Sequence, residues 1–273
     1  MPDIRSTISG QVRALVGSDE LDLSRPEGDD GLFGPGSAVW RVHGDFTAMM
    51  IGGLSSLLLQ MLHPAALAGV WAHSNFRRDP LGRLKRTAQF VTVTSYGATA
   101  AAEQAIAKVR GIHDRVRGTL PDGTPYAASD PALLTWVHVA EVDSFLRAHL
   151  RYRDPALPGA VQDAYLAEYA RVARALGAEN VPTSRAQIAA YYADLRPRLR
   201  CDAQTREVAD TILRPSAGAA GPPSIVLNQA ALDLLPPWAQ ALHGRATPSL
   251  VRPAIRLAAG GLGRTLRWAL SAA

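Results

Sequence analysis

The chain has 273 residues, of which 47% are hydrophobic, so it is long enough to enclose a core in one large domain. Its formal net charge is +5, but the basic residues are scattered and no basic run alternates with aromatic residues, which argues against a nucleic-acid-binding surface. The single cysteine, Cys201, excludes an internal disulfide and a cysteine-rich zinc site.

The beginning of the chain predicts a separate N-terminal segment over residues 1–30. A short helix is predicted over residues 8–16, and a loop rich in glycine, proline and aspartate follows it. Charged residues at Asp3, Arg5 and Arg13 interrupt any apolar signal core. Together with the single cysteine, this pattern predicts a cytoplasmic protein.

Residues 46–72 are the one stretch whose composition is typical of a membrane span. Gln60, His63 and Pro64 interrupt this stretch, and a proline inside a helix breaks its hydrogen bonding. We therefore predict two buried helices that meet near His63–Pro64, with no stable membrane insertion. A transmembrane span is the alternative.

Helical periodicity dominates the rest of the chain, and strand patterns are nearly missing. Gly118, Gly177 and Gly244 are typical of helix ends, whereas the proline-rich segment 214–223 is typical of a hinge. The predicted helices cover residues 45–62, 64–73, 80–96, 99–118, 131–151, 155–176, 184–195, 202–214, 224–234, 235–243 and 248–270. The sequence thus predicts an all-α protein with a single globular domain over residues 31–273.

The helix predicted over residues 131–151 directs His138 inward. Asp130 can cap this helix, and Pro131 suits its first turn. His138 shares one apolar stripe with Leu134 and Phe145. An imidazole aimed at a core needs a hydrogen bond, a charge, a metal or the iron of a flat cofactor. A hydrogen-bonded core histidine is the alternative to a ligand.

A second inward histidine, His113, is predicted on the helix over 99–118, with Arg110 one turn before it. Arginine is suited to holding carboxylates, including haem propionates. The alternative is that Arg110 and His113 bond a buried carboxylate such as Asp143 or Glu141.

Further polar residues lie on the neighbouring helices. We expect His63 to bond backbone carbonyls at a helix junction, and His73 to bond carbonyls at a helix end. Arg83, Arg86 and Thr87 either form a solvated helix face or bind a propionate or substrate.

Common enzyme motifs are missing from the sequence. It contains no GxSxG, no GxxxxGK[ST], no GxGxxG and no HExxH motif. Histidines spaced four residues apart are also missing, so a zinc or di-iron site on one helix lacks its usual ligands.

Five segments carry a family resemblance, and they occur in order at residues 31–45, 57–90, 109–118, 133–145 and 234–244. They include GLFGPGSAVWRVHGD, VRGIHDRVRG and LLTWVHVAEVDSF. In these segments the chain resembles the family of MpaB and latex-clearing protein (rubber oxygenase) catalytic domains, as a bacterial member. Rubber oxygenases of this family cleave carbon–carbon double bonds of polyisoprene with dioxygen, and MpaB-type enzymes cut an isoprenoid side chain.

The resemblance implies an all-α fold with a haem b held between central helices by an axial histidine. It assigns His138 as the metal ligand and Arg110 as a haem-supporting residue. We expect Arg86 and Thr87 as further cofactor-binding positions, and His113 and Arg110 as the catalytic residues. His113 falls on the distal side as a hydrogen-bond donor or sixth ligand, where latex-clearing proteins carry other polar residues. The export signal of the secreted rubber enzymes is missing, so a polymer outside the cell is not the expected substrate.

We therefore expect a haem-b-dependent oxygenase or peroxidase-like oxidoreductase. Its expected partners are a small apolar substrate, dioxygen or peroxide, and an electron donor, with no nucleic acid. One alternative is a non-catalytic carrier or sensor of haem or an apolar ligand. Another is a membrane-attached scaffold, which would use residues 46–72 and the basic helix 248–270.

Overall fold

Helices form nearly all of the protein in the computed structural model, which describes residues 21–214 and 222–271 and the isolated positions 8, 10 and 12. The elements are α2 (Ala38–His43), α3 (Phe46–Gln60), α4 (Pro64–His73), α5 (Pro80–Tyr96), α6 (Thr99–His113), β1 (Arg117–Thr119), β2 (Pro125–Ala127), α7 (Pro131–Tyr152), α8 (Gly159–Leu176), α9 (Arg185–Leu195), a 3-10 turn (Arg196–Arg198), α10 (Ala203–Leu213), α11 (Pro222–Leu234), α12 (Pro237–His243) and α13 (Arg252–Leu270). The all-α prediction is confirmed. The predicted helix 8–16 and most of the predicted hinge 214–223 lie outside the described residues.

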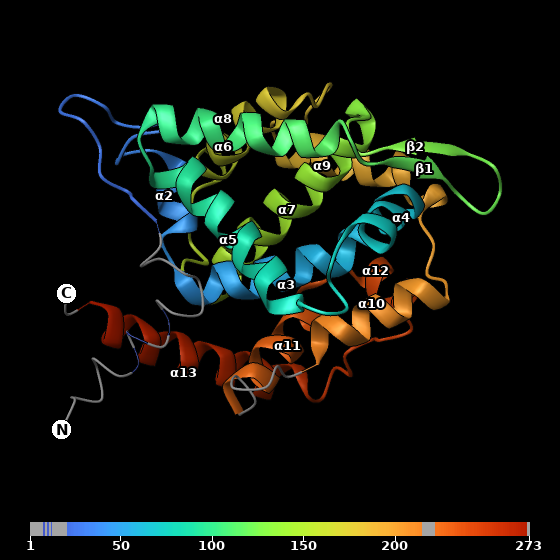
Figure 1. Ribbon diagram of the computed structural model, residues 1–273. Helices are drawn as coiled ribbons and strands as arrows, with labels where there is room; N and C mark the ends of the chain where they lie inside the picture. Colours follow the sequence, from blue (N-terminus) through green and yellow to red (C-terminus); the bar gives the residue numbers. More distant parts are fainter. Residues whose placement is uncertain (1–7, 9, 11, 13–20, 215–221, 272–273) are drawn as a thin grey trace.

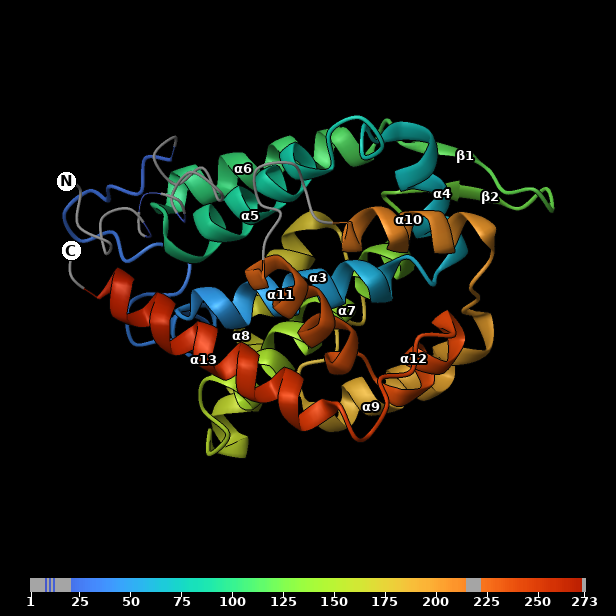
Figure 2. The ribbon, with the colours of Figure 1, turned by 90° about the horizontal axis from the view of Figure 1, so that it is seen from below.

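Helices α3 and α7 pack against each other in the middle of the fold (Figure 1). Gly52 permits their close approach, because a Cβ atom there would lie 2.9 Å from Cδ1 and 3.0 Å from Cα of Phe145. Helices α2 and α8 contact α7 on one side, and α11 and α13 contact α3 on the other. Helices α5 and α6 are joined by a short turn and lie along one flank (Figure 2).

Side-chain caps set several helix boundaries, as the sequence predicts. The Asp130 side chain accepts hydrogen bonds from the backbone N–H groups of Ala132 and Leu133 at the start of α7. Asp79 caps α5 in the same way. Gly177 and Gly244 end α8 and α12 with φ angles of 106° and 63°, which glycine adopts without strain.

The apolar stretch 46–72 forms α3 and α4, which bend by 103° at the break between them. Among the described helices, none is by itself long and apolar enough to cross a bilayer, although this bent pair satisfies the criteria of length and composition. His63 caps α4, with Nδ1 accepting from the Ala65 backbone N–H at 3.2 Å. The prediction that His63 bonds carbonyls is wrong, because it precedes the helix and meets unpaired N–H groups there.

Three local predictions are wrong. Residues 38–43 form α2 within a predicted loop, because Ser37 caps this short helix and accepts from the Trp40 N–H. Helix α6 ends at His113 and not near Gly118, which pairs with Tyr126 in the β1–β2 hairpin. Helix α8 begins at Gly159 because the preceding segment contains two prolines, at 155 and 158.

Candidate functional site

His138 lies inside the fold, as its apolar stripe predicts. Its side chain stacks on Tyr169 of α8, with ring centroids 6.0 Å apart and an angle of 19° between the planes. Its Nε2 atom is buried and has no hydrogen-bond partner in the described part of the chain. Burial, and secondarily the charge of Arg174, lowers the pKa of His138 to about 3. His138 is therefore a neutral imidazole with a nitrogen that no protein group satisfies.

A second buried histidine, His43 of α2, meets the Tyr169 ring edge-on, with ring centroids 4.9 Å apart. The two His43 ring nitrogens form hydrogen bonds with the Ser95 hydroxyl at 2.8 Å and the Tyr165 hydroxyl at 2.9 Å. Burial lowers the pKa of His43 to about 3. Because both of its nitrogens are satisfied, His43 is a structural residue that joins α2 to α5 and α8.

Glu141 lies one turn after His138 on α7, on the same side of the helix. Burial is the main cause that raises the pKa of Tyr165 and of Tyr169, and the negative charge of nearby Glu141 adds to both shifts. Burial raises the pKa of Glu141 itself to about 7. Its side chain nevertheless keeps part of its surface accessible. A carboxyl that is desolvated yet accessible can hold or release a proton at neutral pH.

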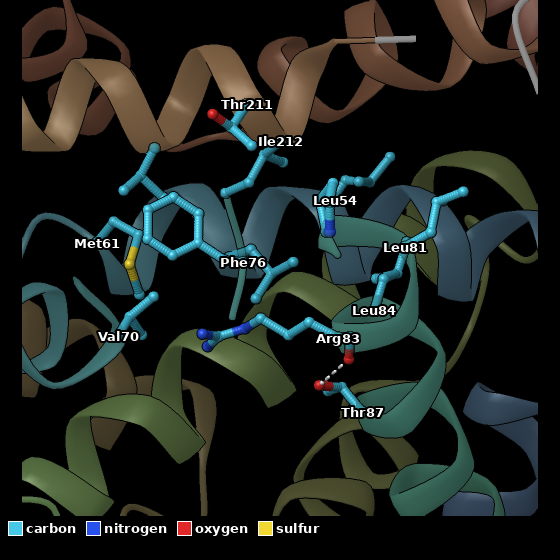
Figure 3. A pocket seen from close by; sticks show the side chains of 13 residues that line it. Leu54, Met61, Val70, Phe76, Leu81, Arg83, Leu84, Thr87, Thr211 and Ile212 are labelled. Atoms are coloured by element: carbon cyan, nitrogen blue, oxygen red, sulfur yellow. Dashed lines mark hydrogen bonds between the residues drawn. The ribbon is translucent and has the colours of Figure 1, made fainter. Parts of the chain in front are cut away.

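An apolar pocket that is partly open to solvent lies between α3, α4, α5 and α10 (Figure 3). Phe76, Met61 and Val70 form one side of it, and Leu54, Leu81 and Leu84 form another. The remaining lining residues are Leu57, Pro80, Arg83, Thr87, Val208, Thr211 and Ile212. Its mainly apolar walls suit a hydrocarbon group.

Arg83 is the charged side chain of this pocket. Its Nη1 atom donates to the Ser74 hydroxyl at 2.7 Å, and burial lowers its pKa. Thr87 also lines the pocket, and its hydroxyl donates to the Arg83 carbonyl at 3.1 Å. Arg86, by contrast, is exposed and pairs with Asp79 at 3.4 Å. His138 is not one of the pocket-lining residues.

Helices α5 and α6 are joined by a short turn and contact each other, and Figure 1 shows them diverging away from that turn. Arg83 and Arg86 lie near the start of α5, whereas Arg110 and His113 lie at the end of α6. Arg110 is exposed and makes no hydrogen bond or ion pair within the described residues.

His113 is half-buried at the end of α6. Neither ring nitrogen of His113 forms a hydrogen bond within the described chain. The Nδ1 atom is enclosed, whereas the Nε2 atom is accessible. Burial lowers the pKa of His113. Like His138, it has an imidazole nitrogen available for a ligand.

The alternative in which Arg110 and His113 bond a buried carboxylate is not observed. Asp143 accepts a hydrogen bond from the Tyr192 hydroxyl at 3.1 Å, and Glu141 has no hydrogen-bond or ion-pair partner within the described residues. The expected role of His73 is also wrong. Its side chain is exposed and bonds no carbonyl in the described structure.

Sequence reasoning missed two buried residues near His138, namely His43 and Tyr169. It named Glu141 only as a partner for Arg110 and His113, and not as a carboxyl close to His138. Tyr165 and Tyr169 carried a usable signal, because residues four apart on a helix share one face. Nothing in the local pattern around His43 indicates that it meets Tyr169, since the two residues lie on different helices.

The described residues contain no group of three or more histidine, cysteine, aspartate or glutamate side chains that could hold a metal ion. No curated protein and no solved structure matches the chain significantly. A family model does match, described as "ER-bound oxygenase mpaB/B'/Rubber oxygenase, catalytic domain", and it spans residues 40–268. These residues include every helix from α3 to α12 and nearly all of α13. The chain therefore belongs to the family of mpaB and rubber oxygenase catalytic domains.

Proposed function

We propose that this protein is a haem-b-dependent oxidoreductase, an oxygenase or peroxidase-like enzyme, that acts on a small apolar substrate. Membership of an oxygenase family supports a redox enzyme. Haem iron, when bound, supplies the activation of dioxygen or of a peroxide. The observation that carries the proposal is that two histidines, His113 and His138, have ring nitrogens without a protein partner, in an all-helical fold that also contains an apolar pocket.

The side chains suit a haem better than a bare metal ion. A bare ion needs three or more protein ligands, and the described residues offer no such group. A porphyrin supplies four nitrogens itself, so a single imidazole from the protein is enough. His113 and His138 both meet this requirement.

The two histidines differ in the space beside their nitrogens. The family resemblance assigns the axial position to His138, and its unpartnered Nε2 supports that assignment. However, an iron needs room next to the nitrogen that binds it, and Nε2 of His138 is enclosed. Nε2 of His113 is not enclosed, and Arg110 precedes His113 by three residues in the last turn of α6. We therefore propose His113 as the iron ligand, with His138 as the competing assignment.

The other residues have roles that follow from their positions. Arg83, Arg86 and Arg110 are the candidates to provide positive charge for the propionates. The apolar walls around Phe76 and Leu84 exclude water and favour a hydrocarbon substrate. Glu141, with a pKa near 7, is available to hold a proton close to His138.

Single alanine variants at His113, His138 and the exposed His73 test the proposal. Each variant is purified with haem supplied, and its haem content and absorption spectrum are compared with those of the unmodified chain. We expect His113→Ala to lose bound haem, while His138→Ala and the control His73→Ala retain it. Loss in His138→Ala alone would transfer the ligand role to His138. Full haem content in both His113→Ala and His138→Ala would overturn the proposed site.

A turnover experiment separates an enzyme from a haem carrier. The haem-loaded protein is supplied with an apolar isoprenoid or aromatic compound. One set of reactions contains dioxygen and a reductant, and the other contains peroxide. We expect an oxidised product that is absent when the protein is left without haem. Stable haem binding with no product under either oxidant would favour the carrier.

A further inference from the structure

The pocket between α3, α4, α5 and α10 combines an apolar interior with a single charged side chain. Met61, Phe76 and Val208 are almost completely buried and form its inner wall. Leu81 also lines the pocket but is 38% exposed, so it belongs to the open edge. Arg83 is the charged residue among the described lining residues, and none of these is acidic. Such a combination is typical of a site for an apolar molecule that a polar group holds at one end.

The Arg83 guanidinium has hydrogen-bond donors to spare. Its Nη1 atom donates to the Ser74 hydroxyl at 2.7 Å, whereas Nε and Nη2 form no hydrogen bond or ion pair within the described residues. Neither of these two nitrogens is enclosed, so a ligand can reach them. Figure 3 shows the Arg83 side chain extended along the pocket toward Val70. The geometry therefore presents free N–H donors beside the apolar walls.

No carboxylate of the described residues balances the charge of Arg83. Burial, and secondarily the charge of Arg86, lowers the pKa of Arg83. The Asp79 carboxylate, which lies on the same turn of chain, accepts from the Gly82 N–H at 2.8 Å and pairs with Arg86 at 3.4 Å. A partly desolvated guanidinium without a counter-ion is unfavourable. A carboxylate from a ligand would balance it through two charge-assisted hydrogen bonds.

The other polar groups of the pocket do not compete for such a ligand. The Thr87 hydroxyl donates to the Arg83 carbonyl at 3.1 Å, and the Thr211 hydroxyl donates to the Glu207 carbonyl at 2.9 Å. Arg83 is thus the one cation among the described lining residues. A single guanidinium matches the single charge of a carboxylate, whereas a diphosphate would carry more negative charge than these residues balance.

We propose that this pocket binds a hydrocarbon chain with one carboxylate group, such as a fatty acid. Arg83 binds the carboxylate, and the chain lies against the apolar walls. This inference deepens the proposed function and rests on it for the role of the bound acid as substrate, although binding itself needs no haem. Neither His113 nor His138 lines the pocket, so a haem placed there would lack its proposed iron ligand. Arg86 and Arg110 remain for the propionates.

Calorimetric titration of the haem-free chain with decanoate and with decanol tests the proposal. The two probes have the same chain length, but only decanoate is charged. We expect decanoate to bind at least about tenfold more tightly, since it alone forms charge-assisted hydrogen bonds with Arg83. Arg83→Gln should remove this preference, whereas Arg83→Lys should keep part of it, because lysine retains the charge without the two-point geometry. The matched control is Arg86→Gln, on the exposed side of the same helix, which should keep the preference.

The proposal is overturned if decanoate does not bind, if it binds no better than decanol, or if Arg83→Gln binds it as well as the unmodified chain does. Haem that competes with decanoate would assign Arg83 to the cofactor and would also overturn the proposal. The comparison of the two probes on the unmodified chain does not depend on the folding of any variant. A chain that binds decanoate through Arg83 but takes up no haem would contradict the proposed oxidoreductase and not the carboxylate site.

Discussion

Replacing Glu141 by glutamine tests the most unusual electrostatic feature of α7. Burial raises the pKa of this carboxyl from 4.5 to about 7, so the folded state holds the proton more tightly than the unfolded state does. Between these two pH values the folded protein binds more protons, and the free energy of unfolding therefore falls as pH rises. Glutamine keeps the shape of the side chain but cannot ionise. The variant should therefore not lose stability through this group as pH rises.

The size of the effect follows from the pKa difference. One pKa unit corresponds to about 1.4 kcal/mol, so the rise from 4.5 to about 7 corresponds to about 3 kcal/mol once the carboxyl is fully ionised. Part of the side chain remains accessible, and solvent reduces the cost. We therefore expect Glu141→Gln to be more stable than the original chain by about 2 kcal/mol at pH 9.

Urea unfolding at pH 5, 7 and 9 measures this difference, with the exposed Glu103→Gln as the control. The difference between Glu141→Gln and the original chain should be smallest at pH 5 and should grow with pH. The control should follow the original chain at all three values. A difference that does not change with pH, or a glutamine variant that is less stable at pH 9, would refute the reasoning.

Two further predictions use matched pairs of variants and the same unfolding measurement. Asp233→Asn should lower the free energy of unfolding by about 2–3 kcal/mol, because it leaves partly buried Arg151 and Arg256 without their carboxylate. Asp210→Asn removes the carboxylate of an exposed pair with Arg245 and should lower the free energy of unfolding by less than about 1 kcal/mol. Equal losses in the two variants would contradict the ion-pair argument. Gly52→Ala should destabilise by about 1–3 kcal/mol through the clash with Phe145, whereas Gly53→Ala, with its nearest atom at 3.8 Å, should be neutral or stabilising by up to about 1 kcal/mol. Equal stability of the two glycine variants would show that α3 and α7 can separate without cost.

Most of the fold was predictable because long helices carry a strong periodic signal and side-chain caps. Asp130 marks the start of α7, and the bounds predicted for α4 and α5 agree with the structure. The β1–β2 hairpin was not predicted, because strands of three residues show no alternation that can be read. Helix α2 was not predicted either, because its six residues are too few to show a helical period.

The candidate site was predictable only in part. The apolar stripe around His138 correctly indicates that the side chain points inward. Periodicity assigns a residue to a face but does not tell which face lines a pocket. Arg83 and Arg86 show this limit, since Arg83 lines the pocket and Arg86 is exposed. The contact of His138 with Tyr169 depends on how α7 and α8 pack, and no local pattern encodes that packing.

Haem titration of the purified chain tests the central claim most directly. The account predicts a saturable absorption band near ~410 nm at one haem per chain, and a change of this band when the reduced protein is exposed to carbon monoxide, since an oxygen-activating iron needs an open position. It also predicts that His113→Ala abolishes the saturable band. A chain that takes up no haem, or that binds it with both axial positions blocked to carbon monoxide, would contradict the proposed oxygenase.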